Sequence, residues 1–148
     1  MNINYETIPV GIRNNNPGNL RHYHNAWKGL SEPPSDGRFC RFIDQEHGLR
    51  AIAKTLLTYQ NLWGLRTVEE IIHRWAPPGE NRTDDYVEPV LYQTGLTDEI
   101  DMADYHTALA MLRAIVRHEN GAGPLHGGDW YTMAQYGSAL MLAGITCT

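Results

Sequence analysis

GIRNNNPGNLR, residues 11–21, is the stretch around which the rest of this chain can be placed. Its four asparagines, two glycines and one proline favour a fixed polar turn over a regular helix or strand. Asn14, Asn15, Asn16 and Asn19 offer hydrogen-bond donors and acceptors without charge, which suits a neutral ligand rich in hydroxyl and acetamide groups, such as an amino-sugar polymer. The alternative is a cluster of amides that only shapes the turn and caps neighbouring elements.

Composition narrows the possible classes of protein. The 148 residues fit one domain, residues 1–148, which is large enough to bury a core without disulfides. The 12 Lys and Arg residues against 17 Asp and Glu give a net charge of −5 without a basic cluster, so nucleic-acid binding is not expected. A membrane segment is not expected either, because no apolar run approaches the ~18 residues of a spanning helix. Cys40 and Cys147 are expected to be free thiols.

Apolar periodicity and capping residues predict a mainly α domain with one small β-hairpin. The hairpin is expected within residues 19–43, with its turn at residues 31–37. The expected helices are 45–61 after Asp44, 68–75 after Thr67, one capped by Thr83 and bent at Pro89, 102–119 ending at Gly121, and 130–143 after Asp129.

Six blocks between residues 11 and 121 carry a family resemblance. They are GIRNNNPGNLR, Trp27-Lys28-Gly29, the aromatic segment 38–42, Glu46-His47-Gly48-Leu49-Arg50-Ala51, the segment 75–86 and Arg117-His118-Glu119-Asn120-Gly121. Together they resemble a family of small phage and prophage proteins that are often described as virion or structural proteins. The chain is also similar to the lysozyme superfamily, in whose flagellar-type glucosaminidases an Asn-rich turn and a Trp-x-Gly precede an aromatic strand and a helix. This resemblance implies a lysozyme-like α+β single domain that acts on bacterial peptidoglycan.

Glu119 is the expected catalytic acid. Continuing the apolar stripe of the 102–119 helix by one helical step leads to this residue, so its carboxyl is expected on the buried side. Burial and the negative C-terminal end of the helix dipole both disfavour the charged form, as a general acid requires. The resemblance adds that lysozyme-like enzymes keep their acid at the end of a helix beside a polar turn. The alternative is a structural Glu that accepts hydrogen bonds from residues 14–19.

Glu46 is the second candidate acid, because residues 46–50 echo the Glu-Gly-x-Arg-Leu of phage endolysins. It falls in the first turn of its helix, where the dipole and free N–H groups stabilise a carboxylate, so a capping role is the favoured interpretation. If Glu119 is the acid, the order of elements differs from that of lysozymes, whose acid precedes the Asn-rich turn. Here only Glu6 lies upstream of that turn, and a circular permutation would reconcile the two orders.

Trp75, Asn81 and Tyr86 are the expected glycan-binding residues on the other side of the site. Sugar rings stack on aromatic faces and form hydrogen bonds with amides, and the resemblance places an Asn and a Tyr from a similar loop in the cleft of lysozyme-like transglycosylases. The alternatives are a helix cap for Asn81 and a core contact for Tyr86. A second catalytic carboxylate is not identifiable by its spacing, which leaves Glu32, Asp36 and Glu80 open.

No metal and no other cofactor is expected. His22, His24 and His118 with Glu119 could in principle bind zinc, but the sequence has no HExxH motif, no pair of neighbouring cysteines and no helical i, i+4 His pair. A Ser or Cys triad is not expected either, because no Gly-x-Ser-x-Gly motif occurs and Cys40 falls in an expected strand.

The sequence therefore predicts a peptidoglycan glycosidase, either a muramidase or a lytic transglycosylase. Because no signal peptide is recognisable, we expect synthesis in the bacterial cytoplasm and delivery to the cell wall by a holin, a virion or a secretion component. The alternative function is a noncatalytic virion or baseplate component that keeps a lysozyme-like fold for binding glycan.

Overall fold

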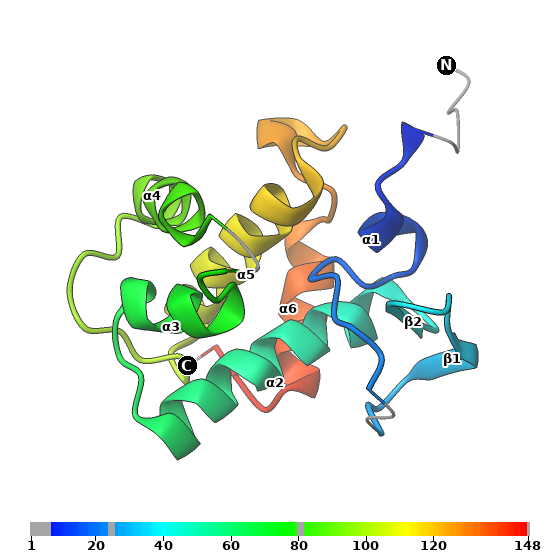
Figure 1. Ribbon diagram of the computed structural model, residues 1–148, viewed down its shortest axis with the longest axis horizontal. Coiled ribbons are helices and arrows are strands. Elements are labelled where there is room, and N and C mark those ends of the chain that lie inside the picture. Colours follow the sequence, from blue (N-terminus) through cyan, green and yellow to red (C-terminus); the bar gives the residue numbers. More distant parts are fainter. Residues whose placement is uncertain (1–6, 24–25, 80–81, 148) are drawn as a thin grey trace.

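The computed structural model describes residues 7–23, 26–79 and 82–147. In chain order its elements are α1 (Val10–Arg13), β1 (Leu30–Ser35), β2 (Cys40–Phe42), α2 (Gln45–Trp63), α3 (Val68–Trp75), α4 (Thr83–Thr94), α5 (Tyr105–Asn120), the 3₁₀ segment η2 (His126–Gly128) and α6 (Met133–Leu142). The mainly α fold with one small antiparallel hairpin, as predicted, is visible in Figure 1.

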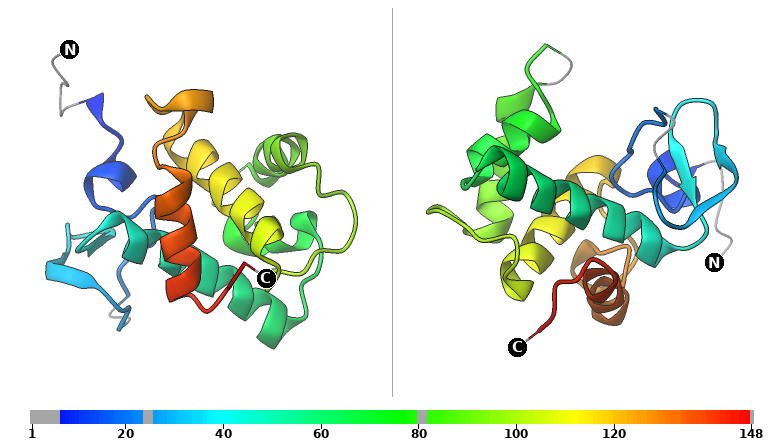
Figure 2. Two further views of the ribbon diagram at one scale, coloured as in Figure 1. Left: turned by 180° about the vertical axis from the view of Figure 1, so that it is seen from behind. Right: turned by 90° about the horizontal axis from the view of Figure 1, so that it is seen from below.

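Helix α2 is the longest element and runs through the middle of the molecule. Asp44 begins it by accepting a hydrogen bond from the backbone N–H of His47, and Gly64 ends it in the left-handed conformation. Its buried face carries Leu49, Ile52, Leu56 and neighbours. Figures 1 and 2 show α1 and the hairpin near its N-terminal end, α3 and α4 near its C-terminal half, and α6 packed along it.

The apolar residues form two cores. The larger lies among the helices, and its largest fully buried side chains include Tyr136, Met111 and Leu112. The smaller lies under the hairpin, where Cys40 and Phe42 of β2 meet Ala51 of α2. The hairpin is thereby anchored to the helical part through α2.

The Asn-rich segment is more helical than its composition indicated. Residues 10–13 form the single turn α1, which begins after Pro9, and the irregular turn comprises only the residues after Arg13. The hairpin turn is also displaced from the expected segment, because β1 includes both Pro33 and Pro34 and the chain reverses at residues 36–39. Proline is tolerated there because β1 is an edge strand.

Two predicted helix caps are wrong. Thr83 is the first residue of α4, and its hydroxyl donates to the carbonyl of Ala76 at 2.7 Å instead of capping the helix. The last helix is capped by Thr132, which forms a reciprocal capping box with Gln135. The expected caps Asp44 and Thr67 are confirmed.

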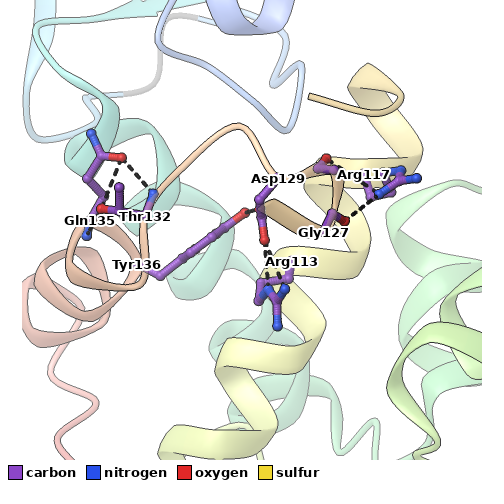
Figure 3. A network of polar contacts seen from close by, with 8 residues as sticks. Arg113, Arg117, Gly127, Asp129, Thr132, Gln135 and Tyr136 are labelled. Carbon is purple, nitrogen blue, oxygen red and sulfur yellow. Dashed lines mark hydrogen bonds and ion pairs between the residues drawn. The ribbon is translucent and has the colours of Figure 1, made fainter. Parts of the chain in front are cut away.

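Asp129, which was expected to cap the last helix, instead joins α5 to α6. Its carboxylate accepts from Arg113 at 2.9 and 3.0 Å and from the hydroxyl of Tyr136 at 2.6 Å (Figure 3). Next to it, the Arg117 guanidinium donates to the carbonyl of Gly127 at 3.1 Å. These contacts fix the loop between α5 and α6. Asp129 was predicted to cap a helix locally, but it forms tertiary contacts instead.

Cys40 and Cys147 are free thiols, as predicted, and burial raises the pKa of Cys40. Among the helices in the described part of the chain, none combines the length and apolar character needed to cross a membrane.

Candidate functional site

Three of the four asparagines hold the hairpin. Asn14 donates to the carboxylate of Asp36 at 2.9 Å, and Asn15 donates to the carbonyl of Phe42 at 3.2 Å. The fully buried Asn16 donates to the carbonyls of residues 20 and 40 and accepts from the backbone N–H of residue 20. Because their Nδ2 donors are engaged in this way, these amides shape the turn instead of extending towards a ligand.

Asn19 has a different partner. Its Nδ2 donates to Oε1 of Glu119 at 3.0 Å, across a sequence separation of 100 residues. The next residue of α5, Asn120, is buried and donates to the carbonyl of Pro17 at 2.8 Å. The end of α5 is therefore attached to the Asn-rich turn at two successive residues, as the candidate site required.

Gly11 allows this close approach of α1 to α5. A Cβ atom on Gly11 would lie 2.7 Å from both the Asn19 and the Asn120 side-chain oxygens. Any larger residue would push these amides apart and would disturb the Asn19 contact with Glu119.

The second oxygen of Glu119 is held by a relay of two aromatic residues. The indole N–H of Trp75 donates to the Tyr86 oxygen at 3.0 Å, and the Tyr86 hydroxyl donates to Oε2 of Glu119 at 2.9 Å. Burial raises the pKa of Tyr86 well above its usual value, and the charge of the neighbouring Glu119 raises it further. The hydroxyl therefore keeps its proton at neutral pH. The direction of both hydrogen bonds is therefore fixed.

His118 covers the outer side of Tyr86. The two rings stack with centroids 3.7 Å apart. Desolvation lowers the pKa of His118, opposed by the smaller effects of Glu119 and Asp85, so the neutral ring is favoured against Tyr86.

Glu119 opens onto a cleft of about 430 Å³. Its lining combines polar and aromatic groups from the Asn-rich turn, the hairpin region, α2, α3 and α5. It comprises Gly18, Asn19, Leu20, Arg21, Tyr23, Phe39, Tyr59, Arg74, Trp75, Ala76, Pro77 and Glu119. Glu119 is the one acidic residue in this described lining. Each of its oxygens has two lone pairs, so an oxygen that accepts from Asn19 or Tyr86 can still carry a proton or meet a ligand.

The structure brings together only part of the predicted site. Glu119, Asn19 and Trp75 line the cleft, which confirms the expected proximity of Glu119 to the Asn-rich turn, while the buried Tyr86 lies behind Glu119 and contacts it. Asn14, Asn15 and Asn16 are not in the described lining. Asn81 lies outside the described residues.

The other acidic candidates lie elsewhere. Glu46 is in the first turn of α2, where its charge acts on Tyr131, and neither residue belongs to the described cleft lining. Asp36 accepts from the backbone N–H groups of residues 38 and 39, and these bonds, with that of Asn14, lower its pKa. Glu32 is exposed on β1, and Glu80 lies outside the described residues.

Several cleft residues were missed at the level of sequence. Tyr59 and Arg74 belong to α2 and α3, which periodicity treated only as packing helices. A signal was present, since Arg74 immediately precedes the predicted Trp75 and was not considered. Tyr23 and Phe39 come from the segment assigned to the hairpin, whose path could not be predicted.

Within the residues that the structure describes, no group of three or more His, Cys, Asp and Glu side chains could hold a metal ion. Of the histidines considered for zinc, His22 lies near the Cys40 thiol at 4.0 Å and His118 stacks on Tyr86. His24 lies outside the described residues.

Fold and cleft together define a small, mainly α domain with one carboxyl group presented in a polar and aromatic cleft. The sequence is 38% identical over 117 residues to Protein P5 of Pseudoalteromonas phage PM2, a match that covers 77% of this chain and 72% of the relative. The chain belongs to the family of this phage protein. No protein-family model matches the sequence. The predicted relationship to phage proteins is thus confirmed.

Proposed function

We propose that this protein is a peptidoglycan glycosidase, a muramidase or a lytic transglycosylase, with Glu119 as its general acid. The observation that carries the proposal is the position of the Glu119 carboxyl. It lies in the wall of the cleft, and its two oxygens are held by Asn19 and Tyr86. A carboxyl that is fixed from two sides while it faces a ligand-sized cleft meets the geometric requirement for proton transfer to a bound substrate.

The proposed reaction uses the same carboxyl twice. Protonated Glu119 gives its proton to the glycosidic oxygen as the bond from that oxygen to the anomeric carbon breaks. The attacking hydroxyl, from water in a muramidase or from the sugar itself in a transglycosylase, then forms the new bond and returns a proton to Glu119. In this proposal Glu119, the one carboxyl in the described lining, carries out both proton transfers.

The rest of the lining supports an amino-sugar ligand. Trp75, Phe39, Tyr23 and Tyr59 provide aromatic faces for sugar rings, and Asn19 stands next to the acid. The mainly α fold with a small hairpin is compatible with the lysozyme-like class, in a circularly permuted order. The site of action would then be the cell wall, reached through a holin, a virion or a secretion component.

One observation favours the noncatalytic alternative. The hydrogen bonds from Asn19 and Tyr86 also make Glu119 a structural bridge between the Asn-rich turn and α4. A virion or baseplate component that only binds glycan would keep this bridge and the aromatic lining, but it would leave the polymer intact.

The deciding experiment is mass analysis of purified peptidoglycan after incubation with the wild type and with Glu119→Gln. We expect the wild type to release glycan fragments, with reducing ends from a muramidase or anhydro-sugars from a transglycosylase. Glu119→Gln should lose nearly all activity, because an amide cannot donate the proton and general acid catalysis contributes ~10²-fold or more. Thermal unfolding of the variant would verify that it is folded.

Glu46→Gln is the matched control, since it makes the same change in the first turn of α2. We expect it to retain turnover and to lose some stability. If Glu119→Gln keeps more than about a tenth of the activity, Glu119 is not the acid. If the losses of the two variants are reversed, Glu46 takes the role, and if the wild type yields no products, the binding alternative holds.

A further inference from the structure

Two arginines in the cleft have no part in the acid chemistry. Arg21 and Arg74 line it together with the single acid Glu119, so the described lining carries an excess of positive charge. The chain as a whole has a net charge of −5. A cleft whose charge is opposite to that of the protein concentrates field lines and favours an anionic ligand over a neutral one.

Arg74 is held in place through the face of its guanidinium group. Its guanidinium carbon lies 4.1 Å from the centre of the Trp63 ring and 5.5 Å from that of the Tyr59 ring. The two aromatic residues are one helical turn apart on α2, while Arg74 comes from α3. Stacking of this α3 side chain on two rings of α2 restricts it before any ligand arrives.

The stacked arrangement leaves the edge of the guanidinium group available. Cation–π contacts involve the face of the group, whereas its N–H donors point outward in the plane. Among the described residues Arg74 forms no ion pair and donates no hydrogen bond. A planar set of free donors held at the wall of a cleft matches the two oxygens of a carboxylate.

We propose that Arg74, held on Tyr59 and Trp63, binds a carboxylate carried by the muramyl side group of the glycan strand. The cleft would thereby select an acidic peptidoglycan strand over a neutral amino-sugar polymer such as chitin. This inference rests on the proposed function, because it assigns a substrate group to the same cleft. The carboxylate has two sources, the free lactyl group of a peptide-free strand and the peptide stem of an intact one.

Binding is measured in the Glu119→Gln background, so that no ligand is consumed. Calorimetric titration uses four soluble oligosaccharides of equal length: peptide-bearing glycan, the same glycan with its carboxylates amidated, peptide-free glycan with free lactyl groups, and chitin. Adding Arg74→Gln should weaken binding of a carboxylated ligand about tenfold or more, while binding of the amidated glycan and of chitin stays unchanged. Arg74→Lys should bind carboxylated ligands with an affinity between those of the proteins with Arg74 and with Arg74→Gln. Lysine keeps the positive charge but lacks the planar pair of N–H donors.

Arg66→Gln is the matched control, because it removes the same charge just before α3 without altering the described cleft lining. It should leave all four affinities unchanged. Raising the ionic strength from about 0.01 M to about 1 M should weaken the carboxylated ligands selectively, because the screening length shrinks about tenfold. An effect on peptide-free glycan identifies the lactyl group as the source of the carboxylate, and an effect confined to peptide-bearing glycan identifies the stem.

If carboxylated glycan binds with the same affinity whether or not Arg74→Gln is added to the Glu119→Gln protein, the inference is overturned. An equal loss for chitin and for carboxylated glycan would also overturn it, because that pattern indicates disturbed packing. These results are separable from failure of the proposed function. Binding that depends on Arg74, combined with a wild type that releases no fragments, refutes the glycosidase and retains the carboxylate site.

Discussion

At the scale of the residue, the site depends on how two donors hold one carboxyl group. Asn19 donates to Glu119 through its side-chain amide, whereas Tyr86 is 4% exposed and itself accepts from the indole N–H of Trp75. In the proposed glycosidase, Tyr86 is therefore a positioning residue that acts through Glu119. Its phenol sets the orientation of the carboxyl, and the high pKa caused by burial keeps the phenol a donor.

Tyr86→Phe should lower both turnover and stability. The variant removes the donor to Glu119 and leaves the Trp75 N–H without its acceptor, a loss that costs ~1–3 kcal/mol of unfolding free energy. Because the ring remains, glycan affinity should change little, so the loss should appear in kcat more than in KM. Denaturant unfolding and kinetics on soluble glycan measure the two effects.

Tyr131→Phe is the control for this variant. Tyr131 is also buried, but its hydroxyl has no hydrogen-bond partner within the described part of the chain. Removing it should leave turnover unchanged and stability within ~1 kcal/mol of the wild type. Equal kinetic losses in Tyr86→Phe and Tyr131→Phe would contradict a specific role for the Tyr86 hydroxyl.

At the scale of the element, α2 positions the Asn-rich turn. Gly48 in its first turns lies directly against the backbone of Asn15, and an added Cβ would collide with the Asn15 carbonyl oxygen. The next part of the turn is also close to its neighbours, since a Cβ on Gly18 would lie 2.8 Å from Ile52 and 3.0 Å from the Trp75 ring. The backbone of the turn is therefore in direct contact with α2.

Gly48→Ala should destabilise the protein by ~1–3 kcal/mol or more, because the obstacle is backbone that cannot change rotamer. It should also reduce wall-degrading activity, since the turn that carries Asn19 has to move. Thermal unfolding and the fragment-release assay test both effects. Gly137→Ala in α6 is the comparison, because its Cβ would meet only the Tyr105 hydroxyl at 3.1 Å. This second variant should stay within ~1 kcal/mol of the wild type, helped by the better helix propensity of Ala.

At the scale of the whole molecule, the site joins segments that lie far apart in the sequence. The Asn-rich turn follows α1, Glu119 and His118 lie in the last turn of α5, and Tyr86 belongs to α4. Figure 1 shows these three helices. Contacts of this kind form only when the domain is assembled. Protonation equilibria at the site are therefore coupled to global stability.

Stability should decrease as the pH falls below about 6.5, the ordinary pKa of His118. Desolvation lowers the pKa of His118 in the folded protein, so the unfolded chain takes up the proton first and is favoured as the pH drops through this window. Chemical denaturation at several pH values from about 8 to about 5 should show this slope in the wild type and a smaller one in His118→Gln.

The carboxylates affect the stability of the fold in a separate, more acidic pH range. The pKa values of Asp36, Asp44, Asp101 and Asp104 lie below their ordinary value of 3.8, so their contribution is present above that value and is lost at more acidic pH. An identical slope above pH 5 in the wild type and in His118→Gln would show that His118 is not the group responsible.

The sequence by itself determined the helices α2 to α6 and singled out Glu119 as the candidate acid. Asp44 and Thr67 were recognisable as caps, because a cap is a contact of a side chain with backbone three residues away. Glu119 was found because helical periodicity continued the apolar stripe to it. Local signals of this kind depend on neighbours in the chain, which the sequence supplies directly.

Only the tertiary structure decided which amides and arginines share the cleft. Asn16 and Asn19 have the same side chain and lie three residues apart, yet one is fully buried under the hairpin and the other contacts Glu119. Asp129 resembled a cap and instead pairs with Arg113, while Arg74 joins the cleft because α3 packs beside α2. The physical reason is that these contacts depend on where separate elements meet in space, which local spacing does not encode.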